Sequence, residues 1–156
     1  MVSIDQVIDH IRNRSYMSGI DRDRARVKTT GEVFTQDWMV RYGLDQIEKN
    51  DPEAFSDSTK TFCDPAAGDG QMLGEALIRK LERVFEKNQV ILEDDFEQAL
   101  STIYGSDIMP DNVKLCQDRL LCGMEQFRDI VNKNIVCGDA FELYPITDNN
   151  FLDLFE

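Results

Sequence analysis

Histidine and cysteine are scarce in this sequence, and long apolar runs are absent. It has one histidine and four cysteines in 156 residues, and no two cysteines have the Cys-x-x-Cys spacing. A zinc site therefore lacks its usual ligands, and we expect the cysteines to be buried, reduced thiols. No run of ~18 apolar residues occurs, and the first residues lack the apolar core of a signal peptide. We expect no membrane span and a cytoplasmic protein.

Positive charge is also scarce, and it is unevenly distributed. The chain has 17 basic and 30 acidic residues, a formal net charge of −13, which argues against a general nucleic-acid binder. Residues 12–28 nevertheless carry six basic side chains against two acidic ones. This basic arm could contact DNA phosphates or pair with the acidic remainder of the chain, and both interpretations stay open. The acid excess itself favours solubility over mimicry of DNA.

Short apolar runs alternate with amphipathic segments along the chain. We predict strands at residues 61–64, 102–108 and 134–140, and helices at residues 3–14, 35–47, 72–86, 93–100, 110–121 and 127–131. Thr35 is the predicted cap of the second helix, and Trp38 is predicted to lie on its packed face. The alternation predicts an α/β fold with a three-strand parallel sheet flanked by helices and an N-terminal helical arm. We divide the chain into this arm, residues 1–30, and a main domain, residues 31–156.

A glycine turn follows the first predicted strand. The segment Asp64-Pro65-Ala66-Ala67-Gly68-Asp69-Gly70 joins that strand to an amphipathic helix, as in the opening of a doubly wound nucleotide-binding unit. We expect Gly68 and Gly70 to let the backbone approach a ligand, because a Cβ there would collide with it. The helix start adds unpaired N–H groups and a positive dipole end. A Gly-x-Gly turn alone is a weak signal.

Each predicted strand ends in an aspartate, namely Asp64, Asp107 and Asp139. Ligands of parallel sheets bind at this edge, so the three acids predict a site there. Asp107 is placed to accept hydrogen bonds from ribose hydroxyls, and Asp139, beside Ala140, from an adenine amino group. Asp64 suits a cation, because a carboxylate repels a pyrophosphate. A nucleoside with a sulfonium-bearing tail fits better than NAD or ATP, while simple capping of the loops is the alternative.

Four segments in order carry a resemblance to a known family. Residues 31–35 are Gly-Glu-Val-Phe-Thr, residues 64–70 hold the glycine turn, residues 104–110 are Tyr-Gly-Ser-Asp-Ile-Met-Pro, and residues 137–140 are Cys-Gly-Asp-Ala. Together they resemble the N6-adenine DNA methyltransferases related to the modification subunits of restriction systems. The resemblance covers about residues 28–145. It implies a Rossmann-like class I methyltransferase fold that binds S-adenosylmethionine.

The resemblance also implies roles for individual residues. In the family the first motif helps to enclose the cofactor, the glycine turn wraps its methionine end, and the second and third strands end at its ribose and adenine. The cofactor-binding residues implied here are Phe34, Thr35, Asp64, Pro65, Ala66, Gly68, Gly70, Asp107, Ile108, Asp139 and Ala140. No catalytic residue and no metal ligand is implied.

The family's catalytic tetrad, Asp/Asn-Pro-Pro-Tyr/Phe, does not occur in the sequence. The resemblance places a fourth strand beside the first, so we expect the first strand to have an open edge. Self-association, the apolar tail at residues 151–155 or a second methyltransferase-type subunit would cover that edge. We therefore expect a cofactor-binding protein that is catalytically incomplete alone and acts with a partner. The alternative is a phage-type regulator or inhibitor of a restriction-modification system, either a cofactor sink or an acidic DNA mimic.

Overall fold

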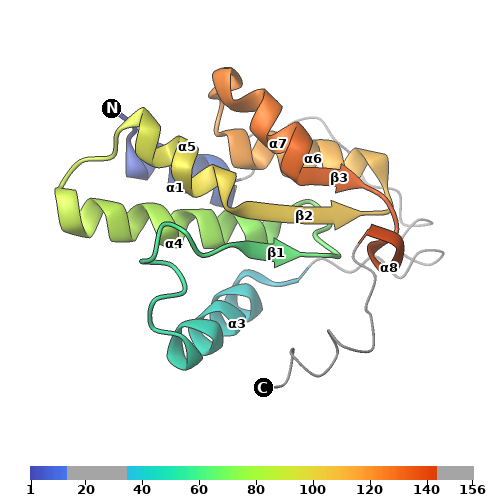
Figure 1. Cartoon of the computed structure of the whole chain (residues 1–156), viewed down its shortest axis with the longest axis horizontal. Coiled ribbons are helices and arrows are strands. Elements are labelled where there is room, and N and C mark those ends of the chain that lie inside the picture. Colours follow the sequence, from blue (N-terminus) through green and yellow to red (C-terminus); the bar gives the residue numbers. More distant parts are fainter. Residues whose placement is uncertain (14–34, 144–156) are drawn as a thin grey trace.

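The computed structural model of the chain describes residues 1–13 and 35–143. Its sheet has the order β1 (Phe62–Asp64), β2 (Ile103–Asp107) and β3 (Ile135–Cys137), and all three strands are parallel. In the register, Phe62 lies opposite Ile103 and Gly105 opposite Ile135, so β2 is the central strand. Figure 1 shows the strands running toward α8 (Ala140–Leu143), which marks the carboxyl edge of the sheet.

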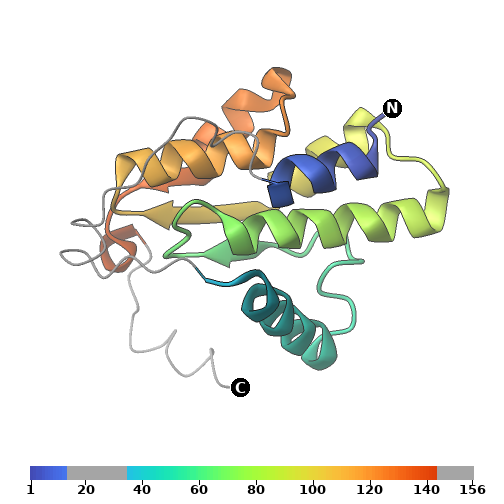
Figure 2. The same ribbon diagram turned by 180° about the vertical axis from the view of Figure 1, so that it is seen from behind.

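Helices connect the strands and cover the sheet. α4 (Gln71–Asn88) follows β1, α6 (Pro110–Leu121) follows β2, and both contact the strands. Seen from behind, these two helices and α1 (Ile4–Asn13) lie in front of the sheet (Figure 2). α5 (Glu93–Ser101) and α7 (Arg128–Asn134) contact β2, and the short 3-10 helix η2 (Glu125–Phe127) precedes α7. The prediction of an α/β fold with a three-strand parallel sheet flanked by helices is confirmed.

α4 is the helix on which the core is built. Its buried apolar side chains are Leu73, Ala76, Leu77, Ile78 and Leu81, all 0% exposed. Full burial of one such leucine or isoleucine contributes roughly 2 kcal/mol. Gly74 allows α1 and α6 to meet at this helix, because a Cβ there would lie 2.7 Å from Ile11 Cγ2 and 3.1 Å from Arg119 Cδ. The N-terminal helix thus belongs to the same core as the sheet.

The helix α3 (Asp37–Asn50) packs beside α4 with a different rotation from the one predicted. Its buried residues are Val40 and Leu44, whereas Trp38 is 61% exposed. The helix is capped at Gln36 without a side-chain hydrogen bond, so the prediction of a Thr35 cap is wrong. α3 buries only the narrow stripe that faces α4, and the wider apolar pattern of its sequence could not indicate which part that is.

The cysteines divide into two groups. Cys116 is buried, and burial raises the pKa of its thiol. Burial also raises the pKa of Cys122 to about 12. Cys63 and Cys137 are exposed, so the expectation that all four are buried is wrong for these two. They lie on β1 and β3, the outer strands of the described sheet, where one flank lacks a covering strand.

Within residues 1–13 and 35–143, no helix is long and apolar enough to cross a membrane. In the same ranges, no group of three His, Cys, Asp or Glu side chains is placed to hold a metal ion. Of the basic arm at residues 12–28, only Arg12 and Asn13 are described, and the apolar tail at residues 151–155 lies outside the described residues.

Candidate functional site

The sheet brings the three predicted aspartates to its carboxyl edge. Asp64 and Asp107 are the last residues of β1 and β2, and Asp139 follows two residues after the end of β3. Each Oδ1 accepts a hydrogen bond from the backbone N–H two residues further on. These bonds are Ala66 N to Asp64 at 3.1 Å, Met109 N to Asp107 at 2.9 Å, and Phe141 N to Asp139 at 2.8 Å. The loop-capping role is therefore present at all three positions.

Asp107 does more than cap its own loop. Its Oδ2 accepts a hydrogen bond from Gly68 N at 3.0 Å, and its Oδ1 also accepts one from Asn112 Nδ2 at 3.2 Å. The carboxylate thus joins the glycine turn to the first turn of α6. A carboxylate has about four acceptor positions, and the three bonds to the described residues leave room for a further donor. Asn112 is not predictable as a partner of Asp107, because nothing in the spacing of the two residues is distinctive.

The two glycines of the turn are required for different reasons. Gly68 has φ +54°, and a Cβ there would meet no atom within 4 Å, so its backbone faces open space. Gly70 has φ +83°, and a Cβ there would lie 2.5 Å from Cys116 Sγ. We expected both glycines to make room for a ligand. At Gly70 the structure replaces that reason with packing against α6, whereas Gly68 has the open backbone that was expected.

The other predicted site residues are distributed around this turn. Pro65 and Ala66 are exposed, and the carbonyl oxygen of Pro65 accepts a hydrogen bond from Ser106 Oγ at 2.9 Å. Ile108 is 63% exposed, and Ala140 is half-buried at the start of α8. Thr35 is exposed just before α3. Phe34 lies outside the described residues.

A buried ion pair lies inside the glycine turn. Arg119 Nη1 of α6 donates to Asp69 Oδ1 at 3.3 Å, with side chains 1% and 2% exposed respectively. The other oxygen, Asp69 Oδ2, is buried without a hydrogen-bond partner among the described residues. Desolvating two charges is costly, so the pair specifies where the turn sits more than it stabilises the fold. The sequence does not predict this pair, because an arginine within a helix gives no signal of its burial.

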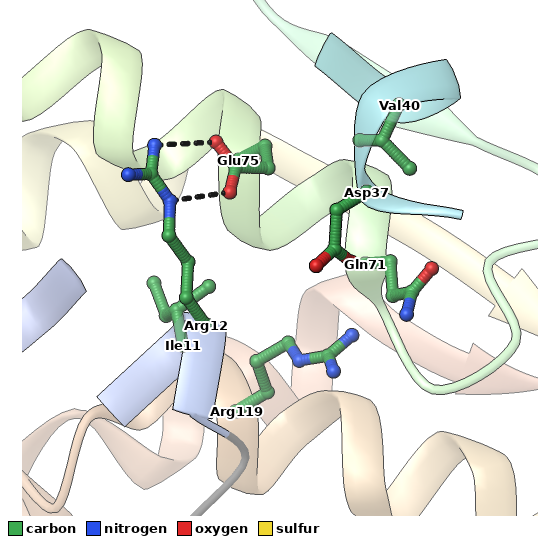
Figure 3. A pocket seen from close by; sticks show the side chains of 7 residues that line it. All are labelled: Ile11, Arg12, Asp37, Val40, Gln71, Glu75 and Arg119. Atoms are coloured by element: carbon green, nitrogen blue, oxygen red, sulfur yellow. Dashed lines mark hydrogen bonds and ion pairs between the residues drawn. The ribbon is translucent and has the colours of Figure 1, made fainter. Parts of the chain in front are cut away.

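A small hollow lies beside the turn, between α1, α3, α4 and α6 (Figure 3). Arg12 closes one side, donating from Nε and Nη2 to the two carboxylate oxygens of Glu75 at 2.7 and 3.0 Å. Arg119 extends from α6 toward Asp37 and Gln71 on the other side (Figure 3). The hollow measures about 20 Å³, enough for about one water molecule. It is a polar contact region between the helices. Arg12 of the basic arm forms an ion pair with Glu75 of α4 there.

The charge at the edge favours a positively charged ligand group. Burial raises the pKa of Asp64, and the negative charge of Asp107 raises it further, while the hydrogen bond from Ala66 N–H opposes the shift. An ionised Asp64 is therefore under electrostatic strain that a nearby cation would relieve.

Comparison of the chain with family models, with curated proteins and with solved structures finds no match.

Replacement of Arg119 by methionine should destabilise the protein strongly. It would leave the buried Asp69 without its countercharge, and we expect the free energy of unfolding to fall by about 3–5 kcal/mol. Urea denaturation measures this loss. The double variant Asp69→Asn/Arg119→Met should recover part of the loss, because no unpaired charge is then buried. Losses that simply add in the double variant would contradict the pairing.

Gly70→Ala should cost more stability than Gly68→Ala. Both positions have a left-handed backbone, but only the first Cβ would collide with Cys116, so we expect a difference of about 1–3 kcal/mol. Thermal unfolding of the two variants measures it. Adding Cys116→Ala removes Sγ and should narrow the gap. Equal losses in the two single variants would show that packing does not require Gly70.

Proposed function

We propose that the chain binds S-adenosylmethionine at the carboxyl edge of its sheet, as a protein of the N6-adenine DNA methyltransferase type with a Rossmann-like class I fold. The observation that carries this proposal is the hydrogen bond from Gly68 N–H to Asp107 Oδ2. It joins an open glycine backbone to the acid that ends the central strand, which is where a nucleoside binds in a doubly wound sheet. The four-motif resemblance supports the same assignment.

Each edge acid has a task that fits its surroundings in the proposed complex. Asp107 accepts a hydrogen bond from a ribose hydroxyl at its remaining acceptor position. Asp139 is exposed, and with Oδ1 engaged by Phe141 N–H its Oδ2 is left to accept from the adenine amino group, beside the small Ala140. Asp64 faces the positive charge of the methionine end. When bound, the cofactor would supply an activated methyl group.

The charges favour this ligand over a nucleotide. Two carboxylates close enough to interact, Asp64 and Asp107, would repel a di- or triphosphate. A sulfonium or ammonium group near Asp64 would instead lower the pKa of that carboxyl and stabilise its ionised form. The proposed ligand carries both cationic groups next to its adenosyl part.

The proposal includes a partner for catalysis. Among the described residues, β1 pairs only with β2, so its other flank offers a position for a further strand. A second methyltransferase-type subunit or a second copy of the chain seated there would bring the tetrad or complete the sheet. Radiolabelled methyl transfer to adenine-containing DNA, assayed with the purified chain alone, tests this part: we expect no transfer.

Asp64→Asn should weaken cofactor binding while leaving the free protein at least as stable. The amide oxygen can still accept the Ala66 N–H bond, but the negative charge is lost. We expect affinity for S-adenosylmethionine, measured by calorimetry, to fall about tenfold. The affinity for S-adenosylhomocysteine, whose sulfur is neutral, should fall less. Loss of equal size for both ligands would contradict a role for Asp64 beside the sulfonium.

The direction of the stability change in the Asp64→Asn variant also follows from the pKa of Asp64. A carboxyl whose pKa is raised in the folded state above its ordinary value of 3.8 destabilises the fold as the pH rises through that range and above. Removing this carboxyl should therefore raise the melting temperature of the free protein at pH 7. Asp94→Asn on α5 is the matched control, since it removes the same charge from an exposed position away from the edge. Asp107→Ala is a poorer probe, because Asp107 also anchors the glycine turn.

A further inference from the structure

A second hollow lies at the opposite side of the molecule from the carboxyl edge, near the amino ends of β1 and β2. The loop of residues 51–61, α4 and α5 enclose it. Phe55, Val84 and Ala99 supply its apolar lining, and Ser58, Gln98 and Lys80 supply polar groups. It measures about 60 Å³, about three times the volume of the hollow beside the glycine turn, so it has room for a few groups of the size of a water molecule. A ligand of about four non-hydrogen atoms would fit it.

Lys80 is an unusual residue in the lining of this hollow, because it is a buried amine. The side chain is on α4 and the residue is only 4% exposed, and its Nζ donates a hydrogen bond to the carbonyl oxygen of Lys60 at 2.7 Å. Among the described residues it takes part in no ion pair within 4 Å. A buried ammonium with three N–H donors and one carbonyl partner is poorly compensated.

The surroundings favour the neutral amine. Burial lowers the pKa of Lys80, and the charge of Asp57 in the loop opposes this only in part. Asp95 of α5 also lines the hollow, and its Oδ2 accepts a hydrogen bond from Leu92 N at 2.8 Å. A lowered pKa increases the neutral fraction of the amine at a given pH, and the neutral amine has a lone pair available for nucleophilic attack.

We propose that Lys80 is a covalent binding site for small carbonyl compounds, namely aldehydes of up to about four non-hydrogen atoms that enter this hollow. The amine nitrogen attacks the carbonyl carbon, and the π electron pair of the C=O bond moves to oxygen. Two protons from nitrogen pass to that oxygen, which leaves as water, and a C=N bond remains. No oxidant or reductant takes part. The acids Asp57 and Asp95 disfavour an anionic ligand, and the apolar lining favours an alkyl chain.

Competitive labelling of the intact chain tests this site. The protein is incubated at pH 7 with propanal and sodium cyanoborohydride, which reduces an imine to a stable amine, and the modified lysines are mapped by mass spectrometry. We expect Lys80 to be labelled at least about fivefold faster than the exposed lysines. Within the described part of the chain, these are Lys49, Lys87, Lys114 and Lys133. A preference below about fivefold overturns the proposal.

Two further experiments test whether the labelling depends on the protonation of the amine and on access to the hollow. The preference for Lys80 should shrink between pH 7 and pH 10, because a much larger fraction of the exposed amines is neutral at the higher pH. Ala99→Leu should fill the hollow and lower labelling of Lys80 alone, while Lys114→Met, a surface control, should leave it unchanged. A preference that is the same at both pH values, or that persists in a folded Ala99→Leu protein, would also overturn the proposal. Calorimetric cofactor binding is independent of all these outcomes.

Discussion

The placement of the glycine turn between β2 and α6 is the constraint on which the candidate site depends. Three contacts of different kinds fix it: Gly70 packs on Cys116, Asp69 pairs with Arg119, and Gly68 N–H bonds to Asp107. The packing of Gly70 sets how closely the turn approaches α6. The buried charge of Asp69 requires Arg119 beside the turn, and the hydrogen bond from Gly68 N–H fixes the position of the turn relative to the end of β2. Because the start of α4 follows directly, the same contacts place the helix around which the core is built.

Structural roles coexist with the proposed ligand-binding roles at the edge acids. One oxygen of each aspartate holds its own loop, and this capping orients the carboxylate before any ligand arrives. Preorganised acceptors bind a ligand with less loss of conformational freedom than mobile side chains do. The cost falls on Asp64, whose ionised form is opposed by burial and by Asp107. Binding sites commonly contain residues that lower the stability of the fold and raise the affinity for a ligand.

Local patterns predicted the elements well and their contacts poorly. Apolar periodicity located β1, β2, β3 and the long helices within a few residues, and the strand-end position of Asp107 placed it correctly at the edge. The rotation of α3 and the burial of Arg119 depend on which helix lies opposite, and no local pattern contains that information. The same limit applies to Gly70, whose partner Cys116 is 46 residues away in sequence. Contacts between residues that are far apart in the sequence could therefore not be predicted from it.

Two polar residues buried on α4 show how the surroundings decide between a structural and a chemical role. Glu75 meets both donor nitrogens of Arg12, so its charge is neutralised with good geometry, and the pair holds α1 on the core. Lys80, five residues further along the same helix, is as deeply buried but has a carbonyl oxygen in place of a carboxylate. A carbonyl can satisfy an N–H donor, yet it cannot neutralise a charge. Glu75 therefore has a countercharge on α1, whereas burial lowers the pKa of Lys80, and its neutral amine beside the hollow is the nucleophile of the proposed reaction.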